Sequence, residues 1–268
     1  MRIGLALQVG TISGRRTITP LSWPWADYHE AVAFNPCDED MDAMAVALGE
    51  LAKAEEADLL LPDIRTGGVL ELICRRLGGD VTADTPVSSV DLTIPENLTA
   101  QAGKKEYLTK RRRLNRRGMM RLVQHRRPNT LRPALTRFIA LHTRQWAGRE
   151  DAVAPFTNPE IHAGFTALTE ELGNEGLIDI TELYSGDALV AAYFGLVFCG
   201  TYFAYRTAFD RDFFRMSPGH LMLQKLLAAC AAEGLHTFDF MRGGYAYKKG
   251  YADRLGCNLR WQQTRPAA

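Results

Sequence analysis

The feature of the sequence that most restricts its fold is a run of three strand candidates in direct succession. These are "GLIDITELY", "ALVAAYFGLVF" and "TYFAYRTAF", at residues 176–184, 188–198 and 201–209. The short segments between them contain Ser185–Gly186–Asp187 and Cys199–Gly200, which are residues that favour tight turns. Apolar strands joined in this way are typical of an antiparallel meander.

The segment after the meander predicts a parallel crossover. The helix candidate "GHLMLQKLLAACAAE" ends at Gly234, and "HTFDFM" (236–241) is the next strand candidate. A strand, a helix and a strand in succession pack back onto one sheet as a right-handed parallel unit. With the meander, this predicts the α/β class in the form of an α+β mixed sheet.

The hydrophobic periodicity of the rest of the sequence predicts further helices and strands, before and after this region. Helices are expected at 38–57, 104–117, 129–146 and 158–172 and after "TGG" up to Gly78–Gly79, and extended segments at 58–64, 85–95, 119–125 and 258–264. We expect Pro133 to start the 129–146 helix or lie in its first turn, where a missing N–H costs little.

Composition narrows the class of protein. The 268 residues are 46% hydrophobic and 24% charged, as in ordinary globular proteins of one large or two modest domains. The five cysteines are widely spaced and form no CxxC pair, which disfavours a disulfide framework and a zinc site. No apolar stretch approaches the roughly 20 residues of a membrane-spanning helix, and no signal-peptide cleavage region follows the N-terminus. We therefore expect a cytoplasmic protein with no membrane span and no metal.

The net charge of +1 hides a strongly basic segment. Residues 104–127 hold eleven Lys and Arg against one Glu, which leaves 21 basic and 30 acidic residues elsewhere. Such a segment either binds a polyanion or forms a face that is solvated or paired within the protein. Both interpretations of Lys104–Arg127 remain open. Its one aromatic residue, Tyr107, does not favour a reader that stacks single-stranded RNA bases.

The stretch "RMSPGHLM" (215–222) predicts a helix start that faces a ligand. With Ser217 as N-cap and Pro218 at the first helical position, the N–H groups of Gly219, His220 and Leu221 would be unpaired. Together with the helix dipole, these amides predict an anion site suited to a pyrophosphate, and Arg211 and Arg215 would add charge. The alternative is a capped helix that binds nothing.

These features resemble the core of the GNAT acyltransferases, and the segment from "SPGHLM" to "GYADR" resembles the CelD-type acetyltransferase-like domain, which is related to the FemAB aminoacyl transferases. The matching motifs are S-P-G (217–219), E-G (233–234), F-D-F (238–240), R-G (242–243) and Y-K (247–248). The resemblance covers residues of about 85–265 and reaches 1–84 only in outline. Many relatives have acidic residues after R-G, where this chain has Gly244–Tyr245, so a general base at that position is in doubt.

The resemblance implies a GNAT-like fold, with a degenerate N-terminal GNAT-like half at 1–92 and an acyltransferase domain at 93–268. It implies acetyl-CoA or another acyl-CoA as co-substrate. The helix-start pattern and the resemblance together give the expected site residues: catalytic Tyr247, Asp239 and Lys248; cofactor-binding Arg211, Arg215, Ser217, Gly219, His220 and Leu221; substrate-binding Arg206, Arg242 and Tyr245.

Four of these residues have alternative interpretations. His220 could be a base near neutral pH, or a hydrogen-bond donor or surface residue. Arg206 could point into the cleft or out to solvent, and alternation does not decide between them. Tyr247 would protonate the departing thiolate, since a phenol has a pKa near that of a thiol, but it could also be packed by its ring, and Tyr245 and Tyr251 are substitutes. Asp239 could be a base, or it could hold Arg242 or Lys248 in place, as most paired buried acids do.

Three functions remain open at this point. The first is an acyl-CoA-dependent N- or O-acyltransferase that acts directly on an amino sugar, a glycan intermediate or another amine or hydroxyl acceptor. The second is a tRNA-dependent aminoacyl transferase of the FemAB type, for which the basic segment would bind the tRNA. The third is a GNAT-shaped accessory protein of polysaccharide synthesis without catalytic activity.

Overall fold

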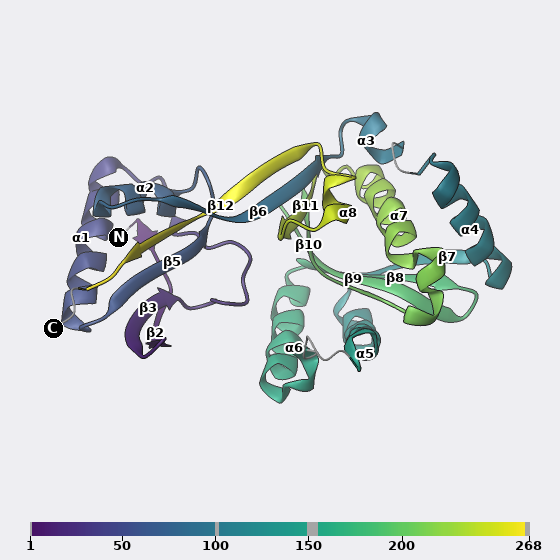
Figure 1. Cartoon of the computed structure of the whole chain (residues 1–268), viewed down its shortest axis with the longest axis horizontal. Coiled ribbons are helices and arrows are strands. Elements are labelled where there is room, and N and C mark those ends of the chain that lie inside the picture. The colour runs from purple at the N-terminus through teal and green to yellow at the C-terminus, as the bar shows by residue number, and fades with distance from the viewer. Residues whose placement is uncertain (1, 100–101, 149–154, 266–268) are drawn as a thin grey trace. The chain divides into compact units, whose positions relative to one another are not determined.

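The computed structural model describes residues 2–99, 102–148 and 155–265 (Figure 1). Contacts between residues divide the chain into two compact units. Unit 1 comprises Met1–Ser88, Met241–Tyr245 and Leu255–Ala268. Unit 2 comprises Ser89–Phe240 and Ala246–Arg254. The tandem arrangement of two GNAT-like halves stays a prediction.

Unit 1 is a sheet packed against two helices, and the last strand of the chain lies within it. Its strands follow the order β2-β3-β5-β12-β6, and β1 pairs separately with β4. Strand β5 is parallel to β3 and antiparallel to β12. The elements are β1 (Ile3–Gly4), β2 (Leu7–Ile12), β3 (Arg15–Pro20), β4 (Val32–Ala33), α1 (Asp38–Ala54), β5 (Asp58–Ile64), α2 (Val69–Leu77) and most of β6 (Thr82–Asp91) and β12 (Arg254–Gln263).

Local sequence explains where the helices of unit 1 begin and end. The Cys37 N–H donates to the Asp40 carboxylate at 3.0 Å, which caps α1. Helix α2 ends at Gly78, whose φ of +78° suits glycine. The Trp261 indole N–H donates to the Gly78 carbonyl at 2.7 Å, and the ring is buried in the core between sheet and helices. The expected helix at 38–57 and the strand at 58–64 are both present.

Unit 2 is a mixed sheet with helices on both faces (Figure 1). Its strands follow the order β6-β11-β10-β9-β8-β7. Helix α7 packs on one face of β8–β10, and α5 and α6 pack on the other. The elements are α3 (Pro95–Thr99), α4 (Lys105–Arg117), β7 (Met120–His125), α5 (Pro128–Trp146), η1 (Pro155–Thr157), α6 (Pro159–Asn174), β8 (Ile178–Ser185), β9 (Ala188–Phe198), β10 (Thr201–Phe209), η2 (Arg211–Met216), α7 (Pro218–Ala232), most of β11 (Thr237–Arg242) and α8 (Ala246–Lys249).

The meander and the crossover predicted from the sequence are both present. Strands β8, β9 and β10 pair in antiparallel fashion, and β10 and β11 are parallel on either side of α7. Helix α7 buries Leu223, Leu226 and Leu227 against the sheet, which explains its apolar sequence. The mixed α/β fold class is therefore confirmed.

The expected place of Pro133 is wrong. Helix α5 starts at Pro128, which occupies the first helical position, so that Pro133 lies inside the helix beyond its first turn. A proline there removes one N–H that would otherwise bond the carbonyl of Asn129. Asn129 is exposed, so water can satisfy that carbonyl and the helix tolerates the proline.

No helix in residues 2–99, 102–148 and 155–265 combines the length and the hydropathy of a membrane-spanning segment.

Candidate functional site

Strands β10 and β11 pair only at their first residues and then part. Their parallel register runs from Thr201↔Thr237 to Phe203↔Asp239 and ends there. Just beyond this point, the register between β10 and β9 shifts between Phe203 and Arg206. Two residues of β10, Ala204 and Tyr205, thus lie opposite one residue of β9, as in a β-bulge. The ladder of hydrogen bonds between β10 and β11 therefore does not continue past Asp239.

A cavity of about 300 Å³ lies on the α7 side of these strands. Its walls come from β9, β10, the start of α7 and α8. They combine apolar surfaces with a few hydroxyl groups and one imidazole, as is usual for a site that binds an organic ligand. The lining residues are Tyr193, Thr207, Phe209, Phe214, Ser217, Pro218, Gly219, His220, Leu223 and Tyr247.

Several hydroxyl groups line this cavity. They include those of Tyr193, Thr207 and Tyr247, and the Thr207 hydroxyl donates to the Ala192 carbonyl at 3.4 Å. Burial raises the pKa of Tyr193 well above its ordinary value, so this phenol stays protonated. The Tyr247 ring contacts Phe240 edge-on, with ring centroids 6.3 Å apart, and this contact fixes its position. Two phenol groups, those of Tyr193 and Tyr247, therefore lie on the wall of this cavity.

His220 lies in a second network on the same cavity. Its Nδ1 is 3.1 Å from the Tyr107 hydroxyl of α4 and 3.2 Å from the Tyr251 hydroxyl. Gln224 donates to the Tyr251 hydroxyl at 3.3 Å. Burial, and after it the charge of Lys110, lowers the pKa of His220. His220 is therefore a neutral imidazole at pH 7, held by hydrogen bonds to Tyr107 of α4 and to Tyr251, which follows α8.

The start of α7 differs from the expected anion site in two respects. Ser217 precedes the helix as predicted, but it is in the left-handed conformation (φ 48°) and its side chain does not cap the helix. The amides of His220 and Leu221 both donate to the Ser217 carbonyl, at 3.1 and 3.2 Å. These two amides are therefore not free, because the first helical turn already uses them. Of the three amides, only that of Gly219 has no acceptor within the described part of the chain.

The other residues expected to bind the cofactor lie outside the cavity wall. Arg211 is exposed and donates to the Ala147 carbonyl at the end of α5, at 3.1 Å. Arg215 is exposed and does not line the cavity. Leu221 is buried in the core between α7 and the sheet. The structure thus brings together Ser217, Gly219 and His220 but not these three side chains.

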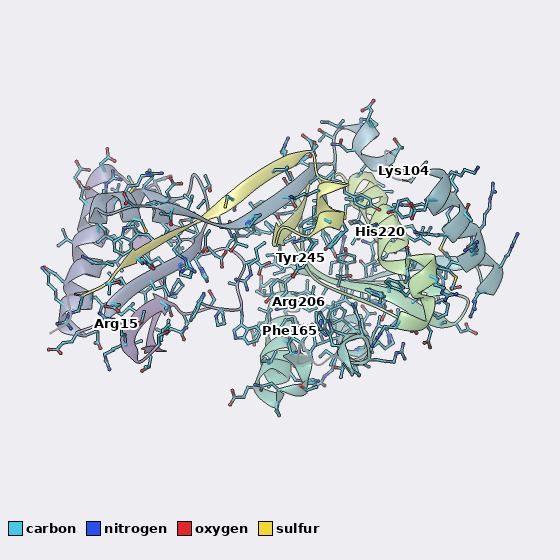
Figure 2. The ribbon with its side chains drawn as sticks, viewed as in Figure 1. Arg15, Lys104, Phe165, Arg206, His220 and Tyr245 are labelled. Atoms are coloured by element: carbon cyan, nitrogen blue, oxygen red, sulfur yellow. The ribbon has the colours of Figure 1, made fainter. Side chains whose placement is uncertain are left out.

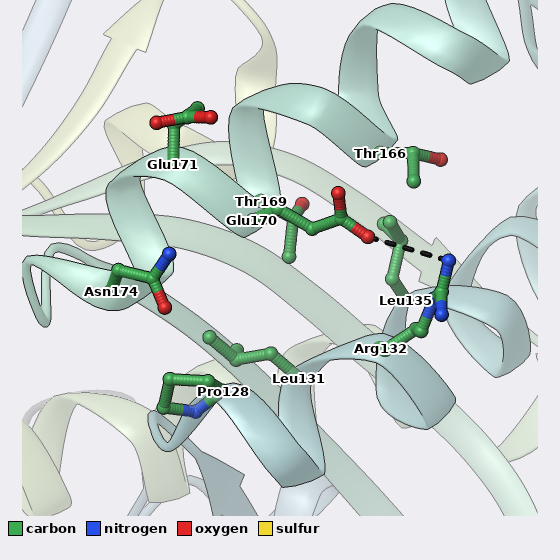
Figure 3. Close-up of a pocket in the computed structure, with 9 residues that line it drawn as sticks. All are labelled: Pro128, Leu131, Arg132, Leu135, Thr166, Thr169, Glu170, Glu171 and Asn174. Carbon is green, nitrogen blue, oxygen red and sulfur yellow. Dashed lines mark ion pairs between the residues drawn. The ribbon is translucent and has the colours of Figure 1, made fainter.

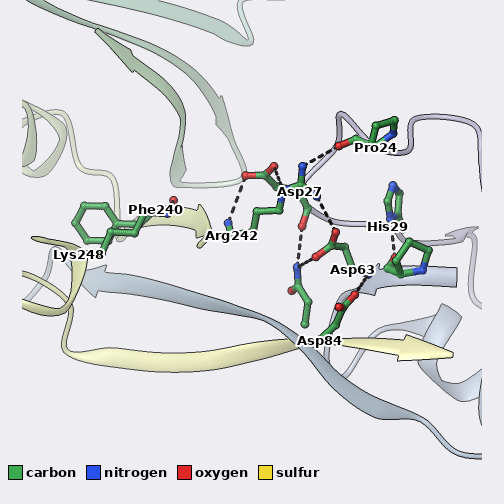
Figure 4. Close-up of polar contacts among 10 residues, drawn as sticks. Pro24, Asp27, His29, Asp63, Asp84, Phe240, Arg242 and Lys248 are labelled. Carbon is green, nitrogen blue, oxygen red and sulfur yellow. Dashed lines mark hydrogen bonds and ion pairs between the residues drawn. The ribbon is translucent and has the colours of Figure 1, made fainter. Parts of the chain in front are cut away.

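Two of the three expected catalytic residues also lie away from the cavity wall. Phe238 and Phe240 belong to the core beneath α7, so the alternation of β11 turns Asp239 to the opposite face. Lys248 is buried, and its ammonium donates to the Phe240 carbonyl at 2.7 Å (Figure 4). This bond ties α8 to β11. Only Tyr247 of the three lines the cavity.

Arg242 belongs to a polar cluster in unit 1 (Figure 4). Its Nε is 2.9 Å from Asp27, its Nη1 2.8 Å from Asp63, and its Nη2 donates to the Pro24 carbonyl at 2.7 Å. Asn258 donates to the Asp27 carbonyl at 2.8 Å and to the Asp63 carboxylate at 3.2 Å. Each nitrogen of the Arg242 guanidinium therefore has a partner within the protein. Tyr245, in the same unit, is 65% exposed.

Arg206 lies on the other face of the sheet in unit 2 (Figure 2). It is opposite Phe194, which packs against α5 and α6, whereas the next residue, Thr207, lines the cavity on the α7 side. The Arg206 guanidinium lies 5.1 Å above the centre of the Tyr205 ring. Arg206 is thus close to the point where the strands part, but on the face away from the cavity.

A second cavity of about 300 Å³ lies between α5 and α6 (Figure 3). Its floor contains Leu131 and Leu135, and an ion pair of 3.4 Å joins Arg132 to Glu170 at its rim. It contains none of the expected site residues. We therefore take the cavity at α7 as the candidate functional site.

Some cations of the basic segment are paired within the protein, and others are not. Arg126 pairs with buried Asp179 and with Glu233. Lys110 pairs with Glu106, and Arg121 lies 4.5 Å above the Tyr184 ring. The remaining cations of α4 are exposed and form no ion pair among the described residues: Lys105, Arg111, Arg112, Arg113, Arg116 and Arg117, the last of which lies 5.7 Å above the Phe213 ring. Internal pairing thus accounts for part of the segment, and one face of α4 remains strongly positive.

The family of the chain follows from a match to a family model. The model of the acetyltransferase (GNAT) domain matches residues 102–249, which is more than half of the chain. The chain therefore belongs to this family and is an acyltransferase. Among curated proteins, no sequence matches it.

Solved structures show the same fold at low sequence identity. The C-terminal DUF2156 domain of a protein described as a lysylphosphatidylglycerol synthetase from Agrobacterium fabrum has a TM-score of 0.66 at 12% identity, over 98% of this chain and 84% of that one. L-PGS from Bacillus licheniformis has a TM-score of 0.61 at 11% identity, over 95% and 79%. FemX has a TM-score of 0.60 at 12% identity, over 96% and 88%.

Sequence reasoning missed several residues of the cavity. Tyr193 and Thr207 belong to strands whose apolar runs hide which side chains face α7. Tyr107 was noted only as the one aromatic residue of the basic segment, and nothing local indicates its contact with His220, 113 residues away. The spacing of the aromatic residues in "TYFAYRTAF" could have suggested which side chains of this strand face α7, but the bulge in β10 breaks the alternation.

Proposed function

We propose that the protein transfers an acyl group from acetyl-CoA or another acyl-CoA to an amine or hydroxyl group of a small acceptor. The cavity at the start of α7, beside the point where β10 and β11 part, carries this proposal. Its apolar walls suit the pantetheine arm, and its hydroxyl groups suit the thioester end. The positive end of α7 and the Gly219 amide would attract the pyrophosphate.

The transfer would be direct. A lone pair of the acceptor forms a bond to the thioester carbonyl carbon, and the C–S bond then breaks as the carbonyl reforms. The Tyr247 hydroxyl donates its proton to the departing thiolate, the attacking nitrogen or oxygen of the acceptor releases its own proton to solvent, and the Tyr247 hydroxyl takes a proton back from solvent. Backbone N–H groups in the bulge of β10 are candidates to stabilise the negative charge on the carbonyl oxygen.

Space at Gly219 supports the position of the co-substrate. A Cβ atom at this residue would contact only Phe209, at 3.9 Å, so the cavity is open beside the one free amide. The expected contributions of Arg211 and Arg215 are reduced, because both side chains are exposed and Arg211 is bonded to Ala147.

Thermal unfolding with and without acetyl-CoA tests this proposal. At a hundredfold excess over Kd, we expect a stabilisation of about 2.7 kcal/mol. Replacing Ser217 by Glu should abolish this shift, because a carboxylate at the start of α7 repels the pyrophosphate. Ser217→Gln, which has nearly the same shape without the charge, should retain it. No shift with any acyl-CoA would refute the proposal.

One observation favours a second candidate, a tRNA-dependent aminoacyl transferase. The exposed cations of α4 leave a positive surface without ion-pair partners in residues 102–148 and the other described ranges. RNA binding through this surface should weaken steeply with salt. Replacing Arg111, Arg112 and Arg113 by Ala should reduce both the affinity and the salt dependence. A control that replaces Arg16, Lys53 and Arg254 removes the same charge elsewhere and should change neither.

The acceptor of the first candidate stays a proposal as well. An amino sugar or a glycan intermediate fits the family resemblance, and acetylation assays with glucosamine as acceptor would test it directly. A cytoplasmic location is likewise a proposal, which fractionation of the source cells would test.

A further inference from the structure

The side of α4 that is turned away from the core of unit 2 carries a stripe of cations. Leu114 of this helix is buried in that core, and the Tyr107 hydroxyl is 3.1 Å from the His220 Nδ1. Because an α-helix has about 3.6 residues per turn, Tyr107 and Leu114 lie on the same inner side of α4. The outer side carries four cations, which we call the cationic stripe: Lys105, Arg112, Arg113 and Arg116.

The cationic stripe has no counter-charge among the described residues. All four of its side chains are exposed and form no ion pair there, and the one acidic residue of α4, Glu106, pairs with Lys110 instead. Arg112 and Arg116 are four residues apart, and like charges at this spacing destabilise a helix. The stripe is therefore available to an anionic partner that would offset this repulsion.

Two large apolar side chains are exposed at the C-terminal end of α4. Met119, two residues after the helix, is 79% exposed, and Phe214 of η2 is 67% exposed. Segment η2 lies against this end of α4, where the Arg117 guanidinium is 5.7 Å above the Phe213 ring. The cationic stripe and the exposed apolar side chains thus belong to one surface of unit 2.

This surface adjoins the cavity at the start of α7. Phe214 lines the cavity and is also exposed, so the cavity reaches the protein surface at this residue. His220 lines the cavity as well, and its hydrogen bond with Tyr107 joins α4 to the cavity wall. A partner bound to the cationic stripe would therefore lie beside the cavity.

The combination of charge and apolar side chains favours a lipid bilayer over a nucleic acid. Anionic headgroups attract clusters of Lys and Arg, and the boundary between headgroups and acyl chains accepts apolar side chains such as Met119 and Phe214. A reader of single-stranded RNA would instead stack aromatic rings on the bases. Tyr107, the one aromatic residue of α4, is half-buried and hydrogen-bonded to His220, so its ring is not offered to a base.

We propose that the cationic stripe, together with Met119 and Phe214, binds the surface of a bilayer that contains anionic lipids. The cations contact the headgroups, and the two apolar side chains reach the edge of the acyl layer. Each cation near an anionic bilayer strengthens binding roughly fivefold, and salt weakens this attraction. The binding does not depend on acyl transfer, so it can fail while the proposed function stands. Because the same cations carry the second candidate function, the experiment includes RNA.

Sedimentation of the full chain with lipid vesicles tests this surface. Vesicles of one part phosphatidylglycerol to three parts phosphatidylcholine would be compared with vesicles of phosphatidylcholine alone, at low and at high salt. We expect binding to the anionic vesicles to be at least about tenfold tighter at low salt and to weaken at high salt. Transfer RNA at an equal concentration of phosphate should leave the protein on the anionic vesicles, because RNA offers no apolar layer to Met119 and Phe214.

A variant of the cationic stripe and a matched control measure the part of the charge. Replacing Arg112, Arg113 and Arg116 by Gln should weaken binding to the anionic vesicles about 100-fold. The control removes the same charge elsewhere and should change binding less than about threefold. It replaces three exposed cations by Gln: Arg16, Lys53 and Arg254.

Met119→Ser measures the apolar part. It should weaken vesicle binding by at least about threefold without changing the dependence on salt. Equal binding to both kinds of vesicle, release by transfer RNA, full affinity in the stripe variant, or full affinity in Met119→Ser would each overturn the proposal. Melting temperatures should be unchanged, because every replaced side chain is exposed. The thermal shift with acetyl-CoA, measured on the same samples, reports separately on the proposed function.

Discussion

Two arginines that the sequence marks equally as substrate-binding have opposite surroundings. Arg242 in unit 1 donates to Asp27, Asp63 and the Pro24 carbonyl, so the protein itself uses its guanidinium. Arg206 in unit 2 contacts an aromatic ring and forms no ion pair among the described residues. A bonded arginine holds a fold together, whereas an arginine with unused donors is available to a ligand. The difference supports a structural role for Arg242, whereas a binding role for Arg206 stays a prediction.

The largest expected effect tests the structural role. Replacing Arg242 by Ala removes the cation from between two buried carboxylates, since Asp27 is 8% and Asp63 3% exposed. Removing one partner from a buried ion pair destabilises a protein by about 3–5 kcal/mol. We expect a loss of this size in the free energy of unfolding measured with urea. In Arg206→Ala the loss should stay below about 1 kcal/mol.

Similar losses of stability in Arg242→Ala and Arg206→Ala would contradict the structural role of Arg242. Arg242→Lys is a useful control, because a single ammonium keeps the charge but cannot bond three acceptors in the geometry of the guanidinium. We expect it to recover only part of the loss.

The next effect concerns pH in the region of Arg206. The pKa of His142 is lowered from 6.5 to about 4 by burial and by Arg206. Between these values the unfolded chain binds a proton at His142 and the folded chain does not, so stability is lost as the pH falls from about 6.5 to about 4. The difference in pKa corresponds to ~3 kcal/mol. Unfolding free energies at pH 7 and pH 4.5 would measure this loss.

His142→Phe isolates this contribution, because His29 and His220 have lowered pKa values as well and remain in the variant. The variant should lose less stability on acidification than the wild type. An identical loss in both proteins would show that His142 is not held neutral by its surroundings.

A third effect should appear in catalysis rather than in stability. Tyr247 lines the cavity at the start of α7, and in the proposed function it would protonate the departing thiolate. General acid catalysis contributes about 100-fold or more to a rate, which is roughly 2.7 kcal/mol. We therefore expect Tyr247→Phe to lower kcat by at least this factor in an acetyl transfer assay, while the melting temperature changes little. Tyr245→Phe, at a residue that is 65% exposed, is the matched control and should retain most activity.

The sequence predicts this fold well wherever local patterns decide it. The strands at 178–185, 188–198 and 201–209 are interrupted by tight turns, and α7 has the apolar pattern of a packed helix. Both features depend on neighbours within a few residues. The expected place of Pro133 was wrong because Pro128 also suits a first helical position, and periodicity alone does not choose between two prolines.

The site was less predictable, because long-range contacts decide which donors remain free. The partners of Arg242 in unit 1, Asp27 and Asp63, are 215 and 179 residues away in the sequence. The face occupied by Arg206 depends on a bulge that simple alternation does not contain. Two of the amides expected to bind an anion donate to the Ser217 carbonyl instead. The residues of the predicted motif, Ser217–His220, line the cavity, but their hydrogen-bonding capacity was not predictable from the sequence, and anion binding there stays a prediction.

The smallest expected effect compares two residues in the left-handed conformation, one in each region. Asp63 (φ 50°) is held there by bonds: its N–H donates to Asp84, and its carboxylate accepts from Arg242 and Asn258. Ser217 (φ 48°) has no side-chain capping bond that would offset the strain. This conformation costs a residue other than glycine about 1–2 kcal/mol.

Ser217→Gly should therefore stabilise the protein, by about 1 kcal/mol at most, because part of the gain is lost to the greater freedom of glycine in the unfolded chain. Asp63→Gly relieves the same strain but removes a buried partner of Arg242, so it should destabilise the protein. Urea unfolding of the two variants gives the sign of each effect. Stabilisation by both would mean that the Arg242 cluster contributes less than the strain at Asp63, and the structural role assigned to Arg242 would fall with it.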